Sequence, residues 1–117
     1  YALGLTLNRL KRTDDSLVEL RRAAELDPNN ARYPYVYAVG LNSAGRADDA
    51  IAVLKTNVDK HPTDRDSLLA LVAFNRDSGK LAPALEYAER LAELAPGDRR
   101  ISELIQALKR QLESAPR

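Results

Sequence analysis

The sequence of 117 residues contains no cysteine, no methionine and no tryptophan, and it has a single histidine. Without cysteine the chain cannot form a disulfide, a thiolate nucleophile, a cysteine-ligated metal site or a covalent haem attachment. A general acid–base site needs a base held beside a partner in a cleft. The one histidine, His61, directly precedes Pro62 in a predicted turn, where we interpret it as an exposed turn residue. We therefore expect no enzyme activity and no cofactor.

An excess of one charge is also missing, because 18 Lys and Arg residues stand against 17 Asp and Glu residues. Binding to nucleic acid or to an acidic membrane surface normally requires a clear basic excess, so we expect neither. No apolar run approaches the roughly 18–20 residues that span a bilayer. The composition, with 44% hydrophobic residues, is typical of one globular domain. The first residues look like the middle of a helix, and we expect the chain to be a piece of a longer protein.

The chain does contain an internal repeat. Pro28, Pro62 and Pro96 are evenly spaced along the sequence, and Gly45 and Gly79 are separated by the same interval, which is the period of the repeat. The residues around the prolines also align, as Leu-Asp-Pro-Asn-Asn, Lys-His-Pro-Thr-Asp and Leu-Ala-Pro-Gly-Asp. Several residue types that agree on one period establish a repeat, and periods of this length are typical of stacked repeat architectures.

Within each repeat the apolar residues recur at helical spacing, as in Leu68, Leu71 and Val72. Glycine, proline, asparagine and aspartate separate these stretches, where helices must end. The short connections make successive helices antiparallel neighbours. The predicted helices are 1–11, 14–27, 31–44, 47–60, 65–78, 81–94 and 99–113.

These features resemble the tetratricopeptide repeat, a helix–turn–helix unit of about 34 residues with small residues at fixed positions and a closing proline. The resemblance implies an all-α superhelix (solenoid) of three helical hairpins plus a C-terminal capping helix, forming a single domain over 1–117. The repeats would be 1–30 (truncated), 31–64 and 65–98, with the capping helix at 99–113. The matching positions are Leu3-Gly4, Tyr37-Ala38, Leu71-Val72, Ser16, Ala50, Ala84 and the three prolines. The departures from the pattern are Lys11, Asn57, Val72 and Leu91.

A second, weaker resemblance involves residues 31–38, 61–66 and 73–79. These segments are similar to the C-terminal repeats of certain bacterial proteins, some of which carry multihaem cytochrome domains. This resemblance favours a bacterial parent protein and the periplasm or cell envelope over the cytoplasm.

The repeat family implies a concave surface lined by the first helix of each repeat, which binds partners. Here that surface would be an apolar and aromatic strip flanked by amides and charges, a pattern that suits an extended peptide or an amphipathic helix. The alternative is that Leu5 and Leu69 are core residues between repeats. The predicted partner-binding residues are Tyr1, Leu5, Asn8, Arg9, Arg32, Tyr35, Val39, Asn42, Leu69, Ala73 and Arg76. Ser43, Asp66 and Asp77 lie at equivalent positions.

We therefore predict a non-catalytic scaffold that binds another protein or another part of its parent chain. The alternative is a self-assembly module, a homodimer that forms through the uncapped N-terminal helix and buries Tyr1 and Leu5. Capture of a C-terminal carboxylate, a known use of the family, is not expected, because the corresponding positions supply no cation. Asp48 and Asp49 begin a second helix, where negative charge favours the helix dipole, so we interpret them as capping residues and expect no metal.

Overall fold

The computed structural model describes residues 16–27 and 29–114, and within this part every regular element is a helix. Each predicted helix end that lies among these residues agrees with the structure to within one residue. The predicted helix 1–11 lies outside the described residues. The helices are residues 16–26, α2 (Arg32–Ser43), α3 (Ala47–Lys60), α4 (Arg65–Asp77), α5 (Leu81–Leu94) and α6 (Arg99–Ser114).

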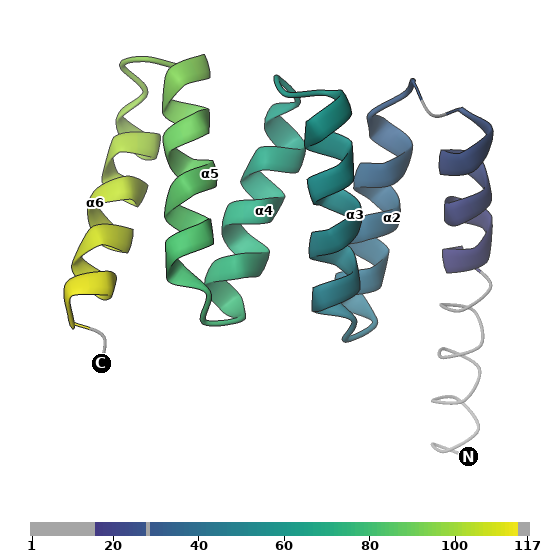
Figure 1. Ribbon diagram of the computed structural model, residues 1–117, viewed down its shortest axis with the longest axis horizontal. Helices are drawn as coiled ribbons and strands as arrows, with labels where there is room; N and C mark the ends of the chain where they lie inside the picture. The colour runs from purple at the N-terminus through teal and green to yellow at the C-terminus, as the bar shows by residue number, and fades with distance from the viewer. Residues whose placement is uncertain (1–15, 28, 115–117) are drawn as a thin grey trace.

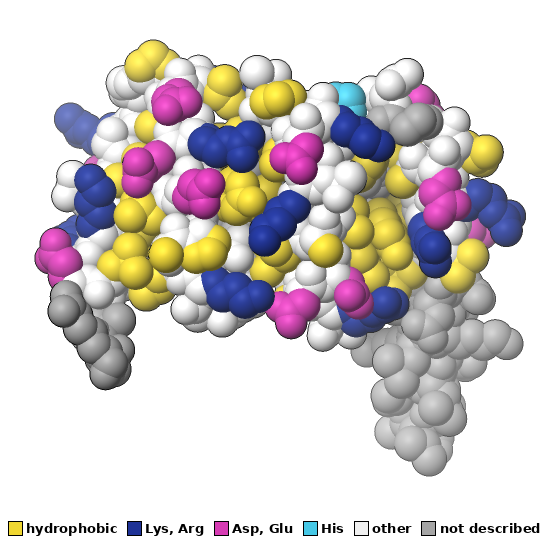
Figure 2. All heavy atoms as spheres, in the orientation of Figure 1, with side chains coloured by type: hydrophobic (Ala, Val, Ile, Leu, Met, Phe, Trp, Pro, Cys, Tyr) yellow, Lys and Arg dark blue, Asp and Glu magenta, His cyan; other side chains and the backbone are white. Residues whose placement is uncertain are grey.

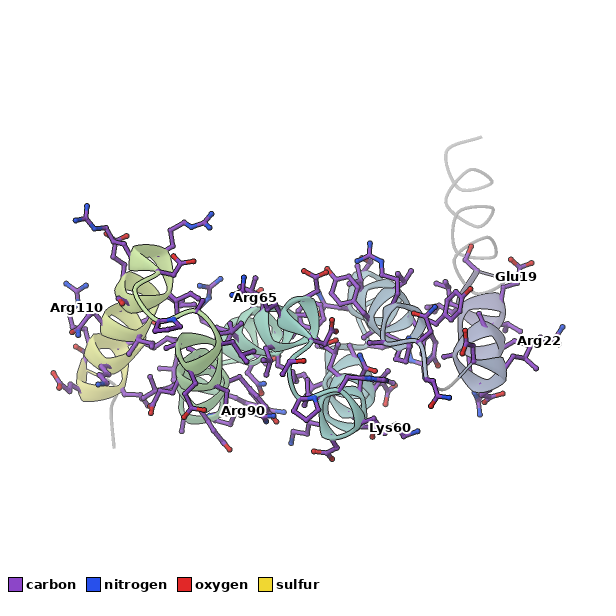
Figure 3. All side chains as sticks on the ribbon, turned by 90° about the horizontal axis from the view of Figure 1, so that it is seen from above. Glu19, Arg22, Lys60, Arg65, Arg90 and Arg110 are labelled. Atoms are coloured by element: carbon purple, nitrogen blue, oxygen red, sulfur yellow. The ribbon has the colours of Figure 1, made fainter. Side chains whose placement is uncertain are left out.

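The helices stand side by side and antiparallel in a single row, from residues 16–26 at one end to α6 at the other (Figure 1). Seen from above, α3 and α5 lie on one side of the row, and α2 and α4 lie on the other (Figure 3). The chain thus alternates between two layers, with α2 and α3 forming one hairpin and α4 and α5 the next. None of the helices among the described residues is long and apolar enough to cross a membrane.

The two repeated glycines end the first helix of each hairpin in the same way. Gly45 and Gly79 have φ angles of 81° and 77°, the left-handed region that glycine adopts without a steric penalty. After each glycine, a backbone N–H reaches back over the helix end, from Arg46 to Leu41 O at 2.9 Å and from Lys80 to Asn75 O at 2.8 Å. This is the Schellman arrangement, which satisfies carbonyls that a helix end would leave free. The repeated spacing of the glycines therefore reflects the same type of turn, which follows α2 and again follows α4.

Small residues lie where the helices of a hairpin meet. Ala38, Ala50, Ala84 and Ala88 are fully buried, which allows the two helices of a hairpin to approach closely. Val72 departs from the small-residue pattern and is nonetheless buried. The largest side chains that are fully buried in the core are Leu41, Leu54, Leu68, Leu71, Leu91 and Leu108.

Asn57, the polar departure from the repeat pattern, connects three segments in the interior. Its side-chain amide donates to Ser67 Oγ at 2.8 Å and to Ala31 O at 3.1 Å. The Ser67 hydroxyl in turn donates to the carboxylate of Asp64, which also accepts from Ser67 N and caps α4. Asn57 is only 3% exposed, so these hydrogen bonds offset the cost of burying its amide.

The last helix packs through one side. Leu108 is buried, and Ile101, Leu104 and Ile105 pack partly buried against the core. Charged residues occupy its other side, including the exposed Glu103. α6 approaches α5, but within the described chain no Cα atom of α6 comes within 8 Å of a Cα atom of α4. α2 and α4 do approach each other this closely.

Candidate functional site

The predicted binding residues that the structure describes all lie on α2 and α4. Together with α6, which occupies the first-helix position of the next repeat, these two helices form what we call the first-helix face. The predicted Tyr1, Leu5, Asn8 and Arg9 lie outside the described residues, as does the surface of the predicted homodimer. The described members are exposed (Arg32, Val39, Leu69, Arg76) or half-buried (Tyr35, Asn42, Ala73).

Leu69 is not the core residue that the alternative interpretation proposed, because 51% of its surface is exposed. Val39 is also exposed, at 37%. A single exposed apolar side chain is common on a protein surface and needs no explanation. Here, however, the two lie at positions of the repeat that face the same side as the half-buried Tyr35. They form an apolar strip across α2 and α4.

A cluster of three side chains lies at one end of this strip. The guanidinium carbon of Arg32 is 5.0 Å from the centroid of the Tyr35 ring, within cation–π range. Arg32 Nη1 also lies 3.4 Å from Asp66 Oδ2, on the neighbouring repeat. Both charged side chains are more than half exposed, so the pair contributes little to stability. Its consequence is local: Arg32 is held over Tyr35, and Asp66 neutralises the cation.

A pocket of about 320 Å³ opens between α4 and α6, and we call it the α4–α6 pocket. It exists because α6 packs on α5 and stays away from α4. Leu91 of α5 lies 2% exposed beneath it. Leu69 lines the pocket, which therefore continues the apolar strip. The remaining lining residues are Arg65, Asp98, Arg100, Ile101 and Leu104.

Two arginines and one aspartate provide the charge at the α4–α6 pocket. Arg65 Nη2 donates to Leu94 O at 3.2 Å, and its side chain lies on the side of the row away from Lys60 and Arg90 (Figure 3). Asp98 directly precedes α6, and its side chain accepts from the Arg100 backbone N at 3.0 Å. The Arg100 side chain is 91% exposed, and its Nε lies 3.7 Å from Asp98. The pocket thus carries a net positive charge beside an apolar floor.

Sequence reasoning did not include the α6 side of this pocket among the binding residues. Arg100 follows Asp66 by one repeat period, so the same register carried one repeat further would have identified it, whereas Leu104 follows Ala70, which is not one of the predicted positions. Both residues lie in the predicted capping helix 99–113, which was not included in the predicted binding surface.

His61 lies in a turn as predicted, with its backbone carbonyl accepting from Asp64 N at 3.1 Å, but the prediction that it is exposed was wrong. It lies at the end of α3 and is half-buried, with its backbone N–H donating to Asn57 O at 2.8 Å. Its Nε2 is buried and has no hydrogen-bond partner among the described residues. In residues 16–27 and 29–114, no three His, Asp or Glu side chains lie close enough together to hold a metal ion.

No family model matches the sequence, and no curated protein matches it. Among solved structures, the chain is similar to the type III secretion chaperone SycD of Yersinia enterocolitica, solved in complex with a peptide of the translocator YopD. The similarity has a TM-score of 0.75 at 17% sequence identity, and it covers 96% of this chain and 91% of SycD. At this identity the similarity establishes the fold. The chain has the tetratricopeptide-like, all-helical architecture of packed hairpins that the sequence predicts.

Proposed function

We propose that this chain is a non-catalytic scaffold whose first-helix face binds an extended peptide or a helix of a partner protein. The observation that carries the proposal is the apolar strip of the exposed Val39 and Leu69 and the half-buried Tyr35, which continues into the α4–α6 pocket. The fold it shares with SycD, a chaperone solved with a bound peptide, supports a peptide as the kind of ligand.

Each part of this face has a role that its chemistry suggests. Tyr35 supplies a broad, stiff contact with few rotatable bonds, which is typical of residues that dominate binding energy. The α4–α6 pocket accepts an aliphatic side chain. Arg65 and Arg100 at its edge favour an acidic group next to that side chain, because guanidinium groups pair well with carboxylates. The half-buried Asn42 offers an amide to the backbone of an extended peptide.

The proposal is tested with peptides selected from a displayed random library against the intact chain. Their affinity is then measured by calorimetry for the wild type and for Tyr35→Ala. We expect the substitution to weaken binding by about 1–2 kcal/mol, roughly a five- to thirtyfold rise in Kd, while the fold is retained. A thermal unfolding curve for each variant confirms that the fold is intact.

Tyr33 provides a matched control on the same helix. It is 38% exposed, and being two residues before Tyr35 it points to a different side of α2. Tyr33→Ala should leave the affinity unchanged. The proposal is wrong if both variants bind with wild-type affinity, if Tyr33→Ala weakens binding as much as Tyr35→Ala, or if Tyr35→Ala unfolds the domain.

A further inference from the structure

A second apolar hollow lies on the other side of the row, away from the first-helix face. It has a volume of about 440 Å³, within the range of roughly 300–1,000 Å³ that is typical of binding pockets. Figure 2 shows hydrophobic side chains gathered between α3 and the helix of residues 16–26. We call this the inter-repeat hollow. It is lined mainly by Ala24, Pro34, Tyr37, Val53, Thr56 and Lys60.

The same place in the next repeat is filled. One repeat period after Val53 stands Tyr87, and one period after Ala24 stands Val58. Tyr87 is 8% exposed and Val58 is 1% exposed, whereas Val53 and Ala24 are only half-buried. Tyr37 is likewise replaced by the fully buried Leu71. The two places are equivalent positions of the repeat, and they differ in the side chains that project into them.

The surroundings of Tyr87 show which side chain this framework accommodates. The Arg90 guanidinium carbon lies 5.6 Å from the centroid of the Tyr87 ring. Burial raises the pKa of the Tyr87 hydroxyl, and the carboxylates of Glu86 and Asp59 raise that pKa further. Tyr87 stands one repeat period after Val53, which faces residues 16–26 across the hollow, so by its repeat position Tyr87 faces α3 at the place that is open one repeat earlier.

We propose that the inter-repeat hollow binds a tyrosine side chain from an acidic segment of a partner protein. The tyrosine would take, between residues 16–26 and α3, the place that Tyr87 takes between α3 and α5. The acidic surroundings follow from the charges of the lining residues. Arg21 is paired with Glu25 at 3.1 Å, whereas Lys60, which also lines the hollow, has no ion-pair partner among the described residues. One cation beside the hollow is therefore left for a carboxylate of the partner.

This second site is independent of the proposed function, because none of the predicted binding residues on α2 and α4 lines it. The test uses the intact chain and a defined probe, the peptide acetyl-Glu-Glu-Tyr-Glu-Glu-amide, followed by NMR titration. We expect saturable shifts at Ala24, Tyr37 and Val53. The same peptide with alanine in place of tyrosine should give no saturable shift.

Filling the hollow from within should prevent binding. Val53→Tyr copies the residue of the next repeat and should raise the Kd of the tyrosine peptide at least about tenfold. Ala24→Val, which copies Val58, is a smaller filling change for use if Val53→Tyr alters the unfolding temperature. Tyr35→Ala should leave this affinity unchanged, which separates the site from the first-helix face.

Charge is tested by Lys60→Glu and by a probe whose glutamates are replaced by lysines, and each should raise the Kd about three- to tenfold. The proposal is overturned if the tyrosine peptide causes no saturable shift around the hollow, or if the filling variants bind it as the wild type does. It is also overturned if the alanine peptide or the lysine-flanked peptide binds equally well.

Discussion

Two successive contacts between repeats stand at equivalent positions of the repeat and are packed very differently. Between α3, α4 and α5, large side chains close the contact, with Leu71 fully buried and Tyr87 almost so. Between residues 16–26, α2 and α3, the equivalent positions hold Tyr37 and Val53, which remain half-buried around a hollow. Equivalent positions of the repeat are therefore occupied by buried side chains at one contact and by half-buried ones around an open hollow at the other.

The interiors of the two hairpins, unlike the contacts between repeats, are packed alike, and they serve as a control for the difference between those contacts. Ala50 and Ala84 are both fully buried where the helices of their hairpins meet. We expect Ala84→Glu and Ala50→Glu each to destabilise the fold by at least about 4 kcal/mol, since each places an unpaired charge in a space that fits a methyl group.

Urea unfolding followed by circular dichroism measures both variants. Ala82→Glu, an exposed position on the same helix as Ala84, should change the free energy of unfolding by less than about 0.5 kcal/mol. If Ala50→Glu were tolerated while Ala84→Glu was not, the interiors of the two hairpins would be packed differently. The open and closed contacts between repeats could then not be compared on an equal basis.

The contact between repeats should respond unequally. Tyr87→Ala removes a buried ring from the closed contact and should cost about 3 kcal/mol, the range seen for large aromatic residues in cores. Val53→Ala, its equivalent at the open contact, should cost less than about 1 kcal/mol, because the Val53 side chain is only half-buried. The same urea unfolding experiment compares the two. Equal losses would show that the open contact is as well packed as the closed one.

A smaller effect is expected at high pH. The pKa of Tyr87 is raised above its ordinary value of 10.0, first by burial and then by the Glu86 carboxylate. The folded chain therefore holds this proton more firmly than the unfolded chain does. Stability from Tyr87 is fully present below the ordinary pKa and is lost as the pH rises through the raised one.

This dependence is measured as the free energy of unfolding at about pH 8 and about pH 11 for the wild type and Tyr87→Phe. The wild type should lose more stability than Tyr87→Phe over this interval. Tyr33→Phe, at an exposed position, should behave like the wild type. A Tyr87→Phe variant that lost as much stability as the wild type would show that this hydroxyl does not titrate differently in the folded state.

The sequence predicted the helices and turns well because the signals are local and repeated. Gly45 and Gly79 adopt the left-handed conformation, and each stands just after the last residues of its helix, so each marks a helix end closely. The repeat position of Leu69 is compatible both with exposure and with burial under a neighbouring helix. The sequence alone therefore could not decide between the two. The resemblance to bacterial envelope proteins stays a prediction.

Two features could not be predicted because they depend on how whole helices are placed. The apolar stripe of α6 indicates that one side is covered, but it does not say whether α4, α5 or both cover it. Packing on α5 without close approach to α4 produces the α4–α6 pocket at Leu104. Asn57 was identified as a departure from the pattern, yet its hydrogen bonds to Ser67 and Ala31 follow only from the folded arrangement.

The central claim is that stacked helical hairpins present the first-helix face to a partner polypeptide. It is tested most directly by NMR, by titrating a library-selected peptide into the isotopically labelled chain and mapping the shifts. The account predicts that the largest shifts fall on Tyr35, Leu69 and Leu104. Large shifts confined to the outward surfaces of α3 and α5, with those three residues unchanged, would contradict it.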